Sequence, residues 1–387
     1  MIGLLLVNLC FSLISLFVNT FLLAQIFVMT GESFVSLGLF SLFNFSFIFL
    51  FQVVGGILCK QLKPIFVTRL STVLACLLLM LIFFVYEALI YHYIILGLLW
   101  GCITGLYYSA YQFLVSKNFK GEATLSYISL YISMISIIKI IFPATFGVVV
   151  YYGNFIMTSL IILIIGCFQF LATFLIKKES EPRKRLNMKG YFKAIKEAEH
   201  FKQGVELWLI ICLTGFADTI TTMTTAFVIL TFNTHLNLGI LTSVFAMMTA
   251  LHSYLYKKAI RFRKYFYGGA VVLPLLSVAF LLWSVSLFSV ALFMGLYLTT
   301  RSVIFMEEET TRLGATSYWG GEAFILESHL FYETALASGA FLSALMVVLI
   351  STFYVQWLVV LLLFAVVFSF SLHGTLLKAW QRVNVKS

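Results

Sequence analysis

The sequence predicts an all-α polytopic membrane protein with twelve transmembrane helices in two pseudo-symmetric six-helix bundles. Of its 387 residues, 62% are hydrophobic and 10% are charged, whereas roughly 45–50% of a soluble domain is apolar. A spanning helix needs about 20 apolar residues, so this chain holds enough for about twelve spans. The composition excludes a soluble globular enzyme, a disordered chain and a disulfide-knotted secreted domain.

Apolar runs separated by short polar turns give the elements in chain order. In the first half we expect helices over residues 2–29, 33–58, 65–86, 93–116, 125–152 and 155–176. In the second half we expect them over residues 205–231, 238–256, 266–283, 286–305, 322–350 and 353–377. Helices are expected because a lipid-exposed backbone must satisfy its own hydrogen bonds. The predicted domains are therefore an N-terminal bundle (1–176), a basic linker (177–204), a C-terminal bundle (205–377) and a tail (378–387).

The basic residues predict the orientation in the membrane. Of the 25 lysines and arginines, 24 fall in alternate turns, in the linker and in the tail, and the intervening turns hold none. Because basic residues are enriched in cytoplasmic loops, we expect both termini in the cytoplasm and the chain in the plasma membrane. The net charge of +10 then reflects topology, and nucleic acid is not an expected partner.

The linker carries its own pattern. Met188, Phe192 and Ile195 fall on one helical face, and Lys189, Lys193 and Lys196 fall on another. This pattern indicates either an amphipathic helix lying on anionic lipid headgroups or a solvated basic linker.

Ionisable residues at mid-depth are the first candidates for function, because each costs at least ~2.5–3.5 kcal/mol to insert. Lys139 lies near the centre of the fifth predicted helix, where it would bind an anionic group or form a structural ion pair. Asp218 lies at the centre of the seventh, among threonines. It would carry a coupling proton or coordinate Na⁺ with the hydroxyls, unless the threonines only bond their own helix.

The eleventh predicted helix carries Glu322, Glu327, His329 and Glu333. Glu322, His329 and Glu333 fall on one face, at offsets of seven and four residues. Buried carboxylates take up protons readily, so Asp218 and Glu333 could share a proton that His329 relays towards the cytoplasm. The alternative is that Glu327 and His329 only anchor the cytoplasmic end of the helix.

Aromatic and small residues mark the fourth helix. Trp100, Tyr107, Tyr108 and Tyr111 are candidates for the wall of an amphipathic substrate pocket. Glycines recur every four residues at Gly97, Gly101 and Gly105, a spacing that lets helix backbones approach closely. Further polar side chains are expected mainly to bond neighbouring helices: Asn8, Asn19, Gln25, Asn44, Gln52, Gln112, Gln169 and His252.

Two segments resemble the major facilitator superfamily of secondary transporters. The family signature Gly-x-Leu-Ala-Asp-Arg between helices 2 and 3 is matched at Gly56 and Leu58, but Lys60 stands at the acidic position. The segment from Phe142 to Gly147 is similar to the Gly-Pro-x-x-Gly-Gly element of the family's exporters. The resemblance implies two halves around a midplane site and alternating access.

We therefore predict a monomeric secondary transporter, with proton-coupled export of an amphipathic or lipid-like small molecule. Sodium is the alternative coupling ion. Uptake of a small organic anion at Lys139 is a second transporter hypothesis, and an integral-membrane transferase using Glu327, His329 and Glu333 is a third. No Walker loop, dinucleotide fingerprint, zincin motif or nucleophile elbow is present, and the six cysteines form no Cys-x-x-Cys pair. We therefore expect no enzyme activity, cofactor or metal.

Overall fold

The computed structural model describes most of the first predicted half and parts of the second. The described residues are 2–31, 33–118, 122–176, 186–197, 204–217, 235–258 and 324–351, with isolated positions between 272 and 297. Within these residues every regular element is a helix. Seven of the helical segments are long and apolar enough to cross a membrane. The predicted helix at 353–377 and the tail lie outside the described residues, as does most of 266–305.

The first half contains six helical spans close to the predicted ranges. The first span is divided into α1 (Ile2–Leu16), the π-helical turn η1 (Phe17–Leu22) and α2 (Leu23–Met29). The others are α3 (Phe34–Gln61), α4 (Pro64–Tyr91), α5 (Tyr93–Asn118), α6 (Glu122–Gly153), and α7 (Phe155–Ala172) with the short 3₁₀ turn η2 (Thr173–Leu175). π-helical turns inside α-helices often occur at functional sites, and η1 lies beside the cavity described below.

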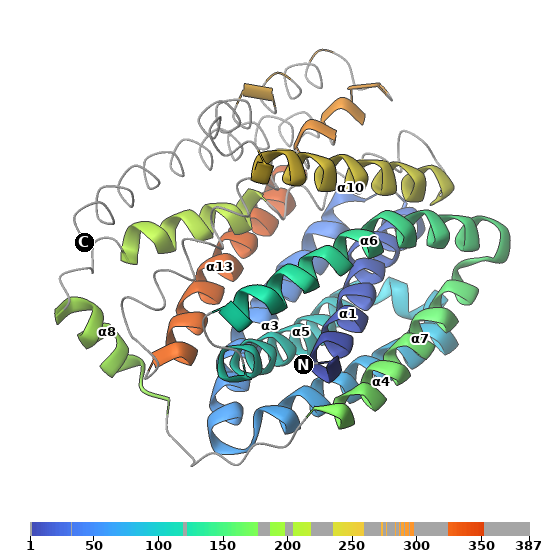
Figure 1. Ribbon diagram of the computed structural model, residues 1–387. Helices are drawn as coiled ribbons and strands as arrows, with labels where there is room; N and C mark the ends of the chain where they lie inside the picture. Colours follow the sequence, from blue (N-terminus) through green and yellow to red (C-terminus); the bar gives the residue numbers. More distant parts are fainter. Residues whose placement is uncertain are drawn as a thin grey trace.

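The described residues after the first half include the linker helix α8 (Met188–Glu197). They also include an apolar helix over Gly204–Ala217, α10 (His235–Lys258) and α13 (Ile325–Ser351). In Figure 1, α13 runs alongside α3, and α10 lies across α6. Because α3 and α6 precede the linker and α10 and α13 follow it, these two pairs join the predicted halves.

Glycine packing confirms that the glycine ladder on α5 is a site of close helix contact. A Cβ atom on Gly97, Gly101 or Gly105 would collide with a main-chain oxygen of α3. A side chain of any size would push α5 away from α3. The backbones of α3 and α5 therefore form one tightly packed wall.

The α6–α10 contact is built around a proline inside α6. Gly239 of α10 lies against the carbonyl of Pro143 and the Cα of Gly147. The main-chain N–H of Ala144 donates to Ser243 Oγ at 3.0 Å. The exporter-like segment of the sequence is thus a packing surface between the predicted halves.

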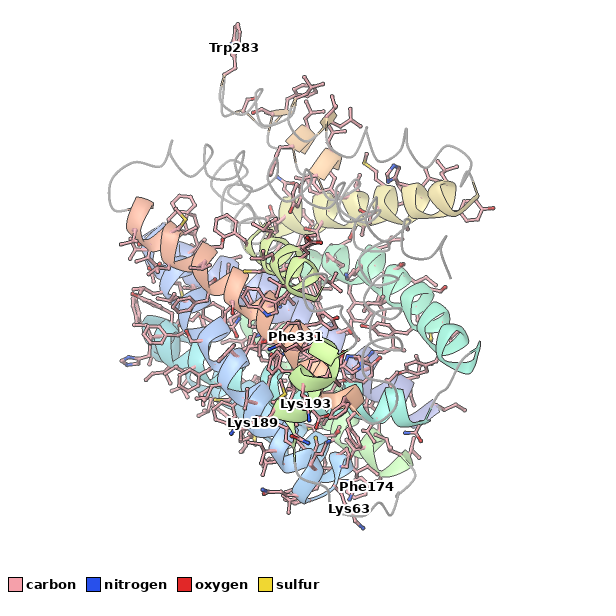
Figure 2. All side chains as sticks on the ribbon, turned by 90° about the vertical axis from the view of Figure 1, so that its left-hand side faces the viewer. Lys63, Phe174, Lys189, Lys193, Trp283 and Phe331 are labelled. Atoms are coloured by element: carbon pink, nitrogen blue, oxygen red, sulfur yellow. The ribbon has the colours of Figure 1, made fainter. Side chains whose placement is uncertain are left out.

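Three lysines from two segments lie towards the same end of the molecule. Figure 2 shows Lys63, Lys189 and Lys193 at one end and Trp283, which is 91% exposed, at the other. We call the first of these the basic end. Lys63 follows α3 and the other two lie on α8, so these two basic segments share one side, as the sequence predicts.

The linker segment forms the helix α8, and part of its predicted apolar face packs on protein. Asn187 caps it by accepting a hydrogen bond from the Gly190 N–H at 2.9 Å. Tyr191 and Ile195 are buried against α13 and the helix over Gly204–Ala217, whereas Phe192 is 40% exposed. Of the predicted apolar face, Met188 and Ile195 therefore pack on protein together with Tyr191, and contact of α8 with lipid headgroups stays a prediction. Burial raises the pKa of the Tyr191 hydroxyl, which keeps it protonated at neutral pH.

Candidate functional site

A cavity of about 210 Å³ lies between the first span, α3, α5 and α13. Its polar lining comes from all four: Ser15 and Asn19, Ser41, Asn44 and Gln52, Thr104 and Tyr108, and Glu333. The turn η1 places Asn19 at the cavity, and Asn19 Nδ2 donates to Ser15 Oγ at 3.0 Å. The cavity therefore joins residues of the first predicted half to one helix of the second.

Glu333 is held by two amides from the first half. Gln52 Nε2 on α3 donates to Glu333 Oε2 at 3.2 Å, and Gln112 Nε2 on α5 donates to Oε1. The carboxyl group of Glu333 thus lies in the cavity and accepts hydrogen bonds across the boundary between the predicted halves.

Three lining residues carry a buried polar atom that has no hydrogen-bond partner among the described residues. These atoms are Asn44 Oδ1, Gln52 Oε1 and Thr104 Oγ1. Buried polar atoms are nearly always hydrogen-bonded, to protein or to a bound molecule. These atoms, around one cavity, are therefore points at which a small molecule or water could bind.

The aromatic wall follows one stripe of α5. Trp100, Thr104 and Tyr108 line the cavity at intervals of four residues, and Gln112 continues the stripe to Glu333. Residues four apart lie on one helical face. Of the four predicted aromatic residues, the structure therefore brings Trp100 and Tyr108 to the cavity.

Tyr107 and Tyr111 do not line the cavity. Tyr107 is completely buried, stacks on Phe11 with ring centroids 3.6 Å apart, and donates to Asn8 Oδ1 at 2.9 Å. The hydroxyl of Tyr111 lies 3.3 Å from that of Tyr127 on α6. Neither of these predicted pocket residues is among those that line the cavity. One residue along a helix turns the side chain by about 100°, away from the Trp100 stripe.

An ion pair joins α3 and α13 at the basic end. Lys60 Nζ lies 2.8 Å from Glu327 Oε1, and the two side chains are 10% and 1% exposed. The main-chain N–H of Asn187 donates to the same oxygen at 3.0 Å. Glu327 lies in the first turn of α13, where the helix dipole favours a negative charge. This carboxylate therefore joins the first half, the linker and the second half.

His329 and Lys139 occupy different parts of the molecule. His329 is buried on α13, one turn from Glu333 towards the basic end. Lys139 is exposed on α6, on the side opposite to the exposed apolar residues Ile137 and Ile141. It is not among the residues that line the cavity. Asp218 and Glu322 lie outside the described residues, so the predicted proton sharing between Asp218 and Glu333 stays a prediction.

The sequence matches the Major Facilitator Superfamily over residues 1–312. The chain belongs to this superfamily. No curated protein matches the sequence.

Solved transporters of the superfamily type share its fold. A POT family transporter in complex with 5-aminolevulinic acid is similar over 97% of this chain and 94% of its own, with 12% identity and a TM-score of 0.70. The human organic anion transporter MFSD10 (TETRAN) is similar over 96% of this chain and 97% of its own, with 15% identity and a TM-score of 0.63. A bacterial homologue of the iron transporter ferroportin, in an inward-facing state, is similar over 97% of both chains, with 13% identity and a TM-score of 0.69. At these identities the likeness shows the fold alone.

Within this Major Facilitator Superfamily member, the residue that departs from the family signature has a defined partner. Lys60 stands at the acidic position of the signature and pairs with Glu327 of the other half. Sequence reasoning did not predict this pair, although it expected Glu327 as an anchor at the cytoplasmic end of its helix and Lys60 in a turn at the same end. It also missed Gln112 as the partner of Glu333, although Gln112 continues the four-residue spacing from Trp100.

Proposed function

We propose that this superfamily member is a proton-coupled secondary transporter that exports an amphipathic small molecule by alternating access. The observation that carries the proposal is Glu333, a carboxylate of the second half held in the cavity by Gln52 and Gln112 of the first. An ionisable residue kept inside a spanning bundle commonly marks a substrate or proton pathway. Rocking of one half against the other would break and remake these bonds.

Proton coupling is assigned to α13. Glu333 would release or take up the proton in the cavity, and His329, one turn closer to the basic end, would relay it. Asp218 is proposed as the second proton carrier. The ion pair between Lys60 and Glu327 is proposed as the gate, because opening the cavity to the basic end requires α3 and α13 to separate.

The direction and the alternatives rest on separate features. Export is supported by the resemblance of the Pro143–Gly147 segment to the exporter element, at a contact between the halves. Uptake of an organic anion at Lys139 is less favoured, since Lys139 does not line the cavity. A transferase using Glu327 and His329 is less favoured as well, because Glu327 is committed to an ion pair and His329 is buried.

Reconstituted transport tests the proposal. Proteoliposomes would be loaded with rhodamine 6G, carboxyfluorescein or a fluorescent phospholipid and exposed to an imposed pH gradient. We expect the gradient to drive at least one probe in the wild type and in the control Glu87→Gln, because Glu87 is exposed at the end of α4. We expect Glu333→Gln to lose the response to the gradient. A Glu333→Gln protein with the wild-type response would overturn the proposal.

A further inference from the structure

We infer that the first half binds an anionic phospholipid on its outer surface, with the lipid phosphate at Arg69 and the acyl chains along exposed apolar residues of α4 and α7. The inference is independent of the proposed transport, because Arg69 does not line the cavity. Three observations carry it: how the guanidinium group is held, which of its donors remain for a ligand, and the apolar surface that continues from it.

An aromatic ring holds the guanidinium group of Arg69. The Cζ atom lies over the ring of Phe174, 4.3 Å from the ring centroid. Phe174 belongs to the 3₁₀ turn η2 that follows α7, and its ring packs edge-on against Phe170, with centroids 5.4 Å apart. A planar guanidinium group held on a ring is pre-organised, so it loses little conformational freedom when it binds an anion.

The donors at the tip of Arg69 remain for a ligand. In the described part of the chain, no carboxylate pairs with Arg69, and its buried Nε atom has no hydrogen-bond partner. The residue is partly exposed, which leaves the two Nη groups accessible. A guanidinium group binds a phosphate through two parallel N–H···O bonds. Arg69 is therefore a positively charged group with the right donors for a phosphate.

The surroundings favour a lipid with a net negative charge. Phe174 and the exposed Lys63 both lie towards the basic end in Figure 2. Arg69 follows Pro64 by five residues, which places it about 8 Å along the axis of α4. A charge at this depth of a spanning helix needs a counter-charge, and lipid headgroups carry one at the edge of the hydrocarbon layer. The ammonium group of a zwitterionic lipid would be repelled by the two basic side chains.

An apolar surface continues from Arg69 towards the middle of the two spans. The helices α4 and α7 pack against each other. Val73 and Leu77 follow Arg69 on the same face of α4, at offsets of four and eight residues, and both are exposed. The exposed residues of the adjoining part of α7 and η2 are Phe168, Leu171 and Phe174. Acyl chains would cover this surface, whereas a soluble phosphate would leave it uncovered.

Lipid binding to the purified full-length protein tests the inference. Native mass spectrometry would measure binding of dioleoylphosphatidylglycerol, which is anionic, and of dioleoylphosphatidylcholine, which has the same chains and a zwitterionic headgroup. We expect the anionic lipid to bind about fivefold more tightly, as for one basic side chain near an anionic group. Glycerol 3-phosphate, which has the phosphate without the chains, should not displace it.

Variants assign the preference to Arg69. Arg69→Gln is expected to weaken binding of the anionic lipid by about five- to tenfold, close to that of the zwitterionic lipid. Phe174→Leu keeps an apolar side chain but removes the ring under the guanidinium group, so we expect a smaller loss. Lys189→Gln is the matched control, because it removes an exposed positive charge at the same end and should bind both lipids as the wild type does.

The contrary outcomes are specific. Equal binding of the two lipids by the wild type would overturn the inference, as would an Arg69→Gln protein that keeps the wild-type preference. An equal loss in Lys189→Gln would show a general effect of charge and would also overturn it. Displacement by glycerol 3-phosphate would indicate a site for soluble phosphates and contradict the lipid assignment. If Arg69→Gln does not fold, as judged by its melting temperature, an unchanged preference in Phe174→Leu would overturn the inference.

Discussion

Gln112 of α5 and Glu333 of α13 are hydrogen-bonded although 221 positions separate them in the chain. The bond crosses from the first predicted half to the second inside the cavity, and Gln52 of α3 makes a parallel one. Nearer the basic end, Lys60 and Glu327 make an ion pair between α3 and α13. These contacts, together with the bond from the Ala144 N–H to Ser243 Oγ, join the described parts of the two predicted halves.

Removing the acid of the basic-end ion pair is expected to be costly. Glu327→Gln leaves Lys60 as an uncompensated, nearly buried charge, which typically costs about 3–5 kcal/mol. The double variant Lys60→Met with Glu327→Gln removes that charge and should recover part of the loss. Thermal unfolding in detergent measures both. If the double variant were less stable than Glu327→Gln alone, the uncompensated charge of Lys60 would not be the cause of the loss.

The glycine ladder gives a prediction about packing. Gly101→Ala places a Cβ against the main-chain oxygen of Asn44, and overpacking of this kind costs about 1–3 kcal/mol. Gly153→Ala is the matched control, because its Cβ would lie 3.5 Å from Met157, an ordinary contact. Melting temperatures of the two purified variants make the comparison. Equal losses would mean that α3 and α5 pack less closely than described.

The capping of α8 predicts a local effect in the linker. Asn187→Ala removes the side-chain acceptor for the Gly190 N–H, and loss of such a cap costs about 1 kcal/mol. We expect faster hydrogen exchange at the Tyr191 and Ile195 amides. Lys189→Ala, which changes an exposed residue of the same helix, is the control and should exchange as the wild type does. Exchange as slow as in the wild type would show that the cap does not hold α8 and that its packing on α13 and on the helix over Gly204–Ala217 is sufficient.

Features that depend on local pattern could be predicted from the sequence. The apolar runs gave the helices of the first half close to their observed limits, and the spacing of Gly97, Gly101 and Gly105 identified the contact surface of α5. Glu333 could be singled out because an acid in an apolar run is costly wherever the helix packs. Each of these features depends only on the residues of one helix and on the lipid or water around it.

Features that depend on which helices meet could not be predicted. The partners of Glu333 lie on α3 and α5, and nothing along α13 specifies them. The same holds for Lys60, whose departure from the family signature became interpretable only once α3 was seen beside Glu327. Tyr107 failed as a pocket residue because composition cannot separate two faces of one aromatic helix, and Phe11 of α1 occupies its face.

Accessibility of the cavity from each side of the membrane tests the central claim most directly. Ser15→Cys, in a protein without the six native cysteines, places a near-isosteric thiol in the cavity lining. An impermeant thiol reagent would be applied to proteoliposomes of known orientation, from one side and then from the other. We predict that Glu327→Gln shifts labelling towards the basic end, because it breaks the gate. If the protein with the ion pair and the Glu327→Gln variant were labelled at the same rates from each side, alternating access through this cavity would be contradicted.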